Sequence, residues 1–231
     1  MGGSGGYDCF LEKDWMEEAV RFVANNPEAG AFGGRNALEW ECPPNDLLLA
    51  YGESLARQDW GDEPKSVAAT GKHCFCGAGL VLRRSAMLAT GYVERGQLRG
   101  RYPGSFAAGE DTEIQLMLRN AGWEICYVPT LRLRHWIPAQ RMTMKHLRPL
   151  HHGFGITEPY LRLLGERRAL TLSNRWLALR WAMHEMGAVL RRFWLGFVRY
   201  KNERPTWVIR LWYATGYLKG ALRLLLLGNA K

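Results

Sequence analysis

The stretch GEDTEIQLMLRNAGWEICYVP, residues 109–129, decides the fold because it joins a glycine-led loop, a helix pattern and a strand pattern. The apolar residues of its first half recur at the spacing of one helix face: Ile114, Met117, Leu118 and Ala121. Gly122 stands where a helix C-terminal cap belongs. The next apolar residues alternate as in a half-buried strand: Trp123, Ile125 and Tyr127. This pattern predicts a helix and then a strand, with Pro129 ending the strand.

Two acidic residues, Glu110 and Asp111, follow Gly109 at the predicted start of this helix. A single acid at a helix N-terminus commonly caps the backbone amides and complements the helix dipole. Two adjacent acids, with Glu113 close by, repel one another, and crowding of this kind suits a general base. The residues alone therefore indicate a candidate acid/base site, with helix capping as the alternative.

Beyond this stretch, residues 131–135 alternate again. Leu131, Leu133 and His135 fall on one side, and Arg132 and Arg134 fall on the other. Because His135 shares its side with apolar residues, we expect its ring to point inward.

The first part of the chain gives weaker signals. Asp14 and Glu17 form a pattern like a capping box, which predicts a helix over 15–24. Residues 31–34 predict a short buried strand. Residues 36–72 predict loops with one short helix near 46–57. The remaining expectations are a glycine loop running into an apolar strand over 74–84 and a mobile loop over 93–105.

Composition describes a near-neutral domain with a basic tail. The chain has 231 residues and a net charge of +9, yet residues 161–231 hold 14 Lys/Arg against 3 Asp/Glu, and residues 1–160 hold 17 against 19. The five cysteines lack metal-finger spacing and are expected to be free thiols in a reducing compartment. We expect a linker-like start over 1–6, one domain over 7–160 and a tail over 161–231.

The tail predicts two amphipathic helices separated by Pro205. The apolar stripe of the first helix is spaced by three and four: Trp176, Leu179, Met183, Met186, Leu190, Phe193 and Phe197. Basic residues fall mostly on the other side, which is typical of a helix lying on an anionic membrane surface. Packing of the stripe against the rest of the protein is the alternative. A spanning helix and nucleic-acid binding are not expected, because charges interrupt the apolar runs and the arginines lie opposite the stripe.

Four segments in order resemble family 2 glycosyltransferases: residues 9–34, GAGLVLRRSAM over 77–87, the opening stretch continued to His135, and RMTMKHLRPLHHGFG over 141–155. The resemblance covers about residues 8–160. It implies an α/β fold, a partial GT-A (Rossmann-like) sheet with flanking helices, followed by the basic helical extension. It also implies inverting transfer of a sugar from a nucleotide-sugar to an acceptor hydroxyl of a glycan or lipid-linked acceptor, in polysaccharide or cell-envelope synthesis.

The resemblance implies a role for each matching residue. Asp111 is the catalytic base, and Glu110 orients acceptor or sugar. Asp8 and His135 hold Mg²⁺ or Mn²⁺ beside the diphosphate. The substrate-binding positions are Gly77, Ala78, Gly79, Gly109 and Arg141.

The sequence departs from the family pattern before Asp8, where Gly6 and Tyr7 stand in place of two further aspartates. The donor-binding half is therefore expected to be missing, either absent or carried on another chain, and the isolated chain is expected to transfer no sugar. The alternative function is a non-catalytic remnant or interaction module with a GT-A-like fold. The implied location is cytoplasmic, peripheral at the inner face of the membrane. The donor sugar, the acceptor and the linkage are not specified by the sequence.

Overall fold

The computed structural model describes residues 8–67, 74–100, 108–199 and 204–227, with no side-chain description for Phe193, 195–199 and 204–205. The chain divides into two compact units, which are described one at a time. The first unit takes in Met1–Gly96 and Asp111–Ala139, and the second takes in Gln97–Glu110 and Gln140–Lys231. The sequence boundary at residue 160 falls inside a helix of the second unit, and the domain limits 7–160 and 161–231 stay a prediction.

The first unit is built on two long parallel strands, β2 (Ala29–Trp40) and β5 (Glu124–Ile137). Three short strands extend this pair antiparallel. β1 (Cys9–Leu11) and β3 (Lys65–Ser66) pair with β5, and β4 (Val81–Leu82) pairs with β2. The main strand order is β1-β5-β2-β4. The prediction of a short strand over 31–34 is correct in position, but the strand continues to Trp40.

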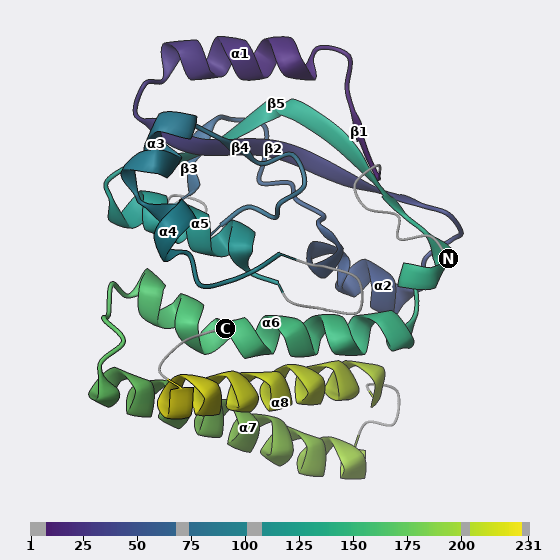
Figure 1. The fold of residues 1–231 in the computed structure, drawn as a ribbon. Helices are drawn as coiled ribbons and strands as arrows, with labels where there is room; N and C mark the ends of the chain where they lie inside the picture. The colour runs from purple at the N-terminus through teal and green to yellow at the C-terminus, as the bar shows by residue number, and fades with distance from the viewer. Residues whose placement is uncertain (1–7, 68–73, 101–107, 200–203, 228–231) are drawn as a thin grey trace, which may run out of the picture. The chain divides into compact units, whose positions relative to one another are not determined.

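Helices cover both faces of this sheet (Figure 1). α1 (Trp15–Asn25) packs on one face against Phe32, Val128 and Leu131. α5 (Glu110–Asn120) packs on the other face through Ile114 and Leu118. Among the described residues of the unit there are also four short helical segments: α2 (Asp46–Ala50), η1 (Gly52–Leu55), α3 (Arg84–Ala89) and α4 (Tyr92–Arg95). The expected α/β sheet with flanking helices is thus confirmed.

The three predicted helices of this unit form, the one near 46–57 as α2 followed by η1, with one correction to the capping. α1 spans the predicted residues, but the side chain of Asp14 makes no capping hydrogen bond, and its backbone is already helical. Gly122 follows α5 with a φ of +91°, as expected for a helix C-terminal cap. The expected loop over 93–105 is wrong at its start, because Val93–Arg95 lie in α4, and residues 101–105 lie outside the described residues.

Pro129 does not end the strand, contrary to the prediction. β5 runs through it to Ile137, and the ladder to β2 is irregular there, passing from Gly33↔Tyr127 to Arg35↔Arg132. A proline is tolerated at such an irregularity, where its missing N–H costs no ladder bond. Gly34 faces this bulge, and a Cβ there would lie 1.9 Å from the carbonyl oxygen of Leu131.

Arg83 joins α1 to the sheet. Its Nε donates to the carbonyl oxygen of Ala29 at 2.8 Å, and its Nη2 donates to those of Val23 and Asn26 at 3.0 and 2.8 Å. The guanidinium therefore satisfies carbonyls at the C-terminal end of α1, where a cation also complements the helix dipole.

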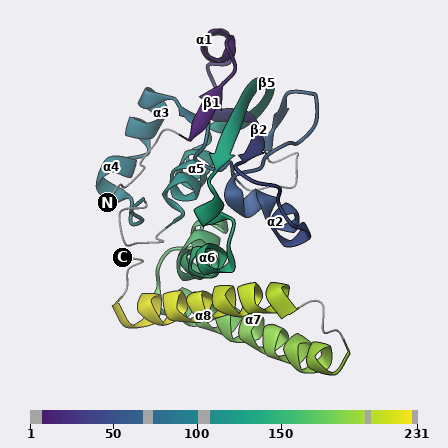
Figure 2. The same cartoon turned by 90° about the vertical axis from the view of Figure 1, so that its right-hand side faces the viewer.

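The second unit contains three long helices, α6 (Met144–Gly165), α7 (Leu172–Arg199) and α8 (Arg204–Leu227). α8 packs against both α6 and α7 (Figure 2). α6 and α8 approach closely along three glycines, Gly155, Gly216 and Gly220. A Cβ at any of them would lie 2.0–2.1 Å from a carbonyl oxygen of the other helix.

The predicted tail helices form, although Pro205 lies in the first turn of α8 rather than before it, a position that proline favours. The buried side of α7 consists of small residues, Ala178, Ala182 and Val189. Trp176, Met183 and Leu190 of the predicted stripe are exposed, and Phe193 and Phe197 lie outside the described side chains. None of the described helices holds a segment long and apolar enough to cross a membrane.

Candidate active site

The loop-to-helix junction at residues 109–111 is shaped by a glycine. Gly109 has a φ of +104°, a left-handed conformation that favours glycine. A Cβ there would also lie 3.0–3.1 Å from Leu98, Thr157 and Leu161, which surround it in the second unit. α5 begins at the next residue, Glu110. The sequence signal of a glycine followed by paired acids thus marks a tight turn into a helix.

Asp111 is half-buried, and its two carboxylate oxygens have different surroundings. Oδ1 accepts a hydrogen bond from the backbone N–H of Thr112 at 2.8 Å. Oδ2 faces Gly77, where a Cβ would lie 3.4 Å from it. One oxygen is therefore held by the helix start, and the other faces the loop over residues 77–79.

That loop is held in place from its far side. Asn36, which is buried in β2, donates from Nδ2 to the carbonyl oxygen of Ala78 at 2.9 Å. Gly79 has a φ of +70°, and a Cβ there would lie 2.4 Å from Cδ2 of Leu133 in β5. The glycines at 77 and 79 therefore allow the backbone to lie directly against Asp111 and against β5.

Gln115 holds the segment before the 77–79 loop next to Asp111. Its Oε1 accepts from the N–H of Phe75 at 2.7 Å, and its Nε2 donates to the carbonyl oxygens of Phe75 at 3.0 Å and Asp111 at 2.7 Å. Sequence reasoning missed both Gln115 and Asn36. The signal for Gln115 was an amide on the apolar face of the helix, four residues after Asp111.

The thiols next to this loop are unreactive. Burial, with a smaller contribution from the nearby Asp111 carboxylate, raises the pKa of Cys74 to about 12 and that of Cys76 to about 11. Cys76 Sγ also accepts a hydrogen bond from Nδ2 of Asn36 at 3.1 Å. Protonated thiols are poor nucleophiles and poor metal ligands, so low reactivity is expected of Cys74 and Cys76.

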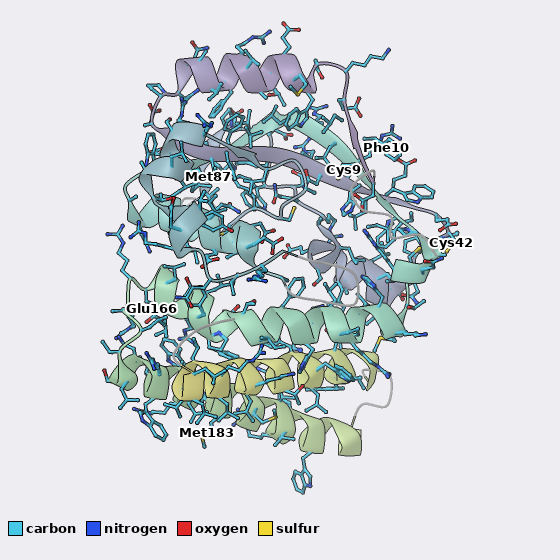
Figure 3. All side chains as sticks on the ribbon, in the orientation of Figure 1. Cys9, Phe10, Cys42, Met87, Glu166 and Met183 are labelled. Carbon is cyan, nitrogen blue, oxygen red and sulfur yellow. The ribbon has the colours of Figure 1, made fainter. Side chains whose placement is uncertain are left out.

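A second polar group lies where β1 meets β5. Nε2 of His135 lies 3.3 Å from Oδ2 of Asp8, and the N–H of Trp136 donates to the carbonyl oxygen of Asp8 at 2.7 Å. His135 is only 9% exposed, so its expected inward orientation is confirmed. Cys9, labelled in Figure 3, pairs directly with His135 and places its Sγ 3.8 Å from Oδ1 of Asp8. Sequence reasoning did not identify Cys9.

Asp8, Cys9 and His135 fit a divalent cation. One ligand atom from each residue lies within 4.8 Å of the other two. In the described part of the chain, Nδ1 of His135 is buried without a hydrogen-bond partner. A carboxylate oxygen, an imidazole nitrogen and a sulfur form a donor set that binds first-row divalent metals.

The two polar groups are connected through β5. The 77–79 loop lies against Asp111 at one end and against Leu133 at the other. Leu133 and His135 are two residues apart on the same face of the strand.

Glu110 and Arg141 belong to the second unit, where Arg141 is half-buried at the end of η3 (Ala139–Arg141).

Comparison with known families accounts for this arrangement. The model of glycosyltransferase-like family 2 matches residues 7–148, which is more than half of the chain. The chain belongs to this glycosyltransferase family. Its first unit is a partial GT-A, Rossmann-like domain, and membership implies a nucleotide-sugar donor and an acceptor. No curated protein matches the chain significantly.

Proposed function

We propose that this chain carries the catalytic centre of an inverting glycosyltransferase that moves a sugar from a nucleotide-sugar to an acceptor hydroxyl. The observation that carries the proposal is the Asp111 carboxylate, with one oxygen held by the start of α5 and the other facing the 77–79 loop. A base that is fixed by the backbone through one oxygen can aim its other oxygen at a single hydroxyl.

In this proposal Asp111 accepts the proton of the acceptor hydroxyl while that oxygen attacks the anomeric carbon. The bond from that carbon to the diphosphate breaks on the opposite side, which inverts the configuration. Glu110 orients acceptor or sugar at the same helix start. Gly77, Ala78, Gly79 and Gly109 present backbone without obstructing side chains, and Arg141 clamps the diphosphate through charge-assisted hydrogen bonds.

Asp8 and His135 are the residues that would hold a divalent cation, Mg²⁺ or Mn²⁺. Family 2 enzymes commonly use such ions, and the residues present fit one. A cation there would supply positive charge where the departing diphosphate becomes negative. The buried ring of His135 keeps its Nε2 directed at Asp8, so the two ligands are held close together before any cation binds.

Membranes from cells that express the chain from its own gene provide the test, since partner chains and acceptors are then present. We expect Asp111→Asn to lower transfer of labelled sugar from a panel of nucleotide-sugars by at least about 100-fold, the low end for loss of a general base. Glu110→Gln should lower it less. Asp46→Asn is the matched control, because Asp46 is an exposed acid that also begins a helix. Activity of Asp111→Asn within a few-fold of the parent would remove Asp111 as the base.

The second candidate is a non-catalytic interaction module that keeps the fold. Calorimetry of the purified chain with nucleotide-sugars in the presence of Mn²⁺ separates this candidate from the first. Binding that Asp8→Ala weakens supports a transferase. If membranes with Asp111→Asn transfer sugar at the normal rate and the purified chain binds no nucleotide-sugar, the non-catalytic interaction module is supported.

We further propose that α7 lies on an anionic membrane surface at the inner face of the membrane, near glycan or lipid-linked acceptors. Five large apolar residues of α7 are 52–72% exposed and fall within an arc of about 40° on the helix: Leu172, Trp176, Met183, Leu190 and Trp194. Figure 3 labels Met183 among them. The exposed Arg180, His184 and Arg191 flank one side of this arc. Apolar side chains that insert into a membrane next to basic residues favour anionic lipid, and each basic residue near the surface adds about 1 kcal/mol to the binding free energy.

Flotation with vesicles of anionic and of neutral lipid tests the membrane proposal. The chain should float with anionic vesicles, less at high salt, and Trp176→Ser/Trp194→Ser should reduce flotation by at least about tenfold, since each buried Trp contributes more than about 1.4 kcal/mol. A matched control is Trp212→Ser on α8, which is exposed outside the arc. Equal flotation of all three proteins would exclude the α7 arc as the contact.

A further inference from the structure

We propose that the Cys9 thiolate is a third ligand of the cation held by Asp8 and His135, and that the site therefore takes a borderline-soft cation such as Zn²⁺ or Co²⁺ in preference to Mg²⁺. This inference rests on the metal site of the proposed function but not on sugar transfer. Asp8 and His135 alone offer oxygen and nitrogen, which suit many cations. A thiolate favours softer cations, because hard Mg²⁺ prefers oxygen ligands and retains its water.

Strand pairing brings the sulfur to the site. β1 and β5 are antiparallel, and Cys9 lies directly opposite His135 in the register. Directly opposed residues of an antiparallel pair project from the same face, with Cβ atoms about 4.5–5.5 Å apart. The carboxylate of Asp8 reaches the same place from the residue before the strand, where the Asp8 carbonyl is anchored by Trp136. Three different donors therefore converge from two strands.

The distance from nitrogen to oxygen already resembles that of an occupied tetrahedral site. With about 2.1 Å from metal to nitrogen or oxygen and about 2.3 Å to sulfur, tetrahedral angles separate nitrogen from oxygen by about 3.4 Å and sulfur from oxygen by about 3.6 Å. His135 Nε2 and Asp8 Oδ2 are 3.3 Å apart. Cys9 Sγ lies 3.8 Å from the other carboxylate oxygen, Oδ1, and one ligand atom from each residue lies within 4.8 Å of the other two, so a cation draws the sulfur in as it binds.

The exposure of the three ligands suits a site with an open position. His135 is buried, whereas Asp8 and Cys9 are half-buried. Three protein ligands with a fourth position open to solvent is the usual arrangement of catalytic zinc, and the open position would accept an oxygen of the diphosphate. When the metal binds, the Cys9 thiol loses its proton to the buffer and the sulfur forms the metal–thiolate bond.

Cobalt absorption reports thiolate ligation directly. The full chain is stripped with a chelator and titrated with Co²⁺. A sulfur-to-cobalt charge-transfer band in the near ultraviolet is expected, and Zn²⁺ should displace it whereas Mg²⁺ should not. Cys9→Ser should abolish the band and weaken Co²⁺ binding by at least about 100-fold, the upper end for loss of an outer-shell partner. Cys126→Ser is the control, because Cys126 lies in β5 outside the ligand cluster.

Three results would overturn the inference: no cobalt binding, binding without the charge-transfer band, or a band that survives in Cys9→Ser. A measurement without any variant covers the case in which Cys9→Ser fails to fold. In the unaltered chain, Zn²⁺ should slow alkylation of Cys9 by at least about tenfold while leaving that of the exposed Cys42 unchanged, as judged by peptide mass spectrometry. Equal alkylation of Cys9 with and without Zn²⁺ would contradict ligation. Asp111→Asn should keep the cobalt band, so loss of transfer and loss of metal binding are separable.

Discussion

Replacement of Gly216 by alanine tests the close packing of α6 and α8. A Cβ at this position would lie 2.1 Å from the carbonyl oxygen of His152 and 3.0 Å from its carbonyl carbon. Carbon–oxygen contacts settle near about 3.3 Å, so one of the two helices must move by about 1.2 Å. Because the obstructing atom belongs to a helix backbone, no side-chain rotation can relieve the clash.

The energetic cost follows from that displacement. Overpacking of a tight core costs about 1–3 kcal/mol, and a gap of 0.5–1 Å forfeits a quarter to a half of the dispersion energy of each contact that it opens. Alanine recovers about 1 kcal/mol of helix propensity relative to glycine. Because the obstructing atom is backbone, we take the upper part of the overpacking cost and expect Gly216→Ala to destabilise the second unit by about 1–2 kcal/mol after this gain is subtracted.

Gly187 provides the matched control, because it also lies inside a long helix, and among the described residues no atom beyond its chain neighbours and its own helix backbone lies within 4 Å of an added Cβ. Gly187→Ala should stabilise the unit by about 0.5–1 kcal/mol through propensity alone. Urea unfolding followed by circular dichroism measures both changes, and hydrogen exchange of α6 and α8 amides assigns them to this unit. The reasoning is refuted if the two substitutions shift stability equally or in the same direction.

Three further predictions concern stability and thiol reactivity. Arg83→Met removes three hydrogen bonds to carbonyl oxygens and should lower the free energy of unfolding by about 2–4 kcal/mol. Arg84→Met, at the neighbouring exposed position, should change it by less than about 0.5 kcal/mol. Urea titration measures both changes. Burial lowers the pKa of His151 to about 4, so the unfolded chain takes up its proton near pH 6.5 and the folded chain only near pH 4. The free energy of unfolding should therefore fall by at most about 3 kcal/mol as the pH drops from 6.5 to 4. His151→Leu should remove that fall. Cys42 is exposed and should be alkylated first at pH 8, while Cys74, with its pKa raised to about 12, should react at least about 100-fold more slowly; equal rates would contradict its burial.

The elements that sequence could predict are those whose signal is local. The period of the apolar residues after Asp111 is helical, and Gly122 supplies the cap, so α5 was predictable from its own residues. Alternation around Leu133 likewise predicted the inward face of His135. These two local patterns placed the two residues that matter most in the candidate site.

Features that depend on distant partners were not predictable. β5 continues through Pro129 because Gly34 of another strand leaves room for the bulge. Cys9 reaches the candidate metal site only through the register of β1 against β5, which its own residues do not reveal. α7 buries Ala178 and Ala182 rather than its large apolar residues, because small side chains allow the closest approach to α8. The large apolar residues Trp176, Met183 and Leu190 are thus not the ones that pack against the protein, which was the alternative to their lying on a membrane surface.

The candidate metal site depends on one of the short strand pairings of the sheet. β1 contributes only three residues to its ladder with β5, and a slip by one residue would turn Cys9 to the opposite face, away from His135. A cation that binds Asp8, Cys9 and His135 together favours one register over the others, and it stabilises that register by RT ln(1 + [L]/Kd). Metal binding and strand pairing therefore reinforce each other in the first unit. Since Leu133 of the same strand also lies against the 77–79 loop that faces Asp111, the position of β5 affects both the candidate metal site and the surroundings of the candidate base.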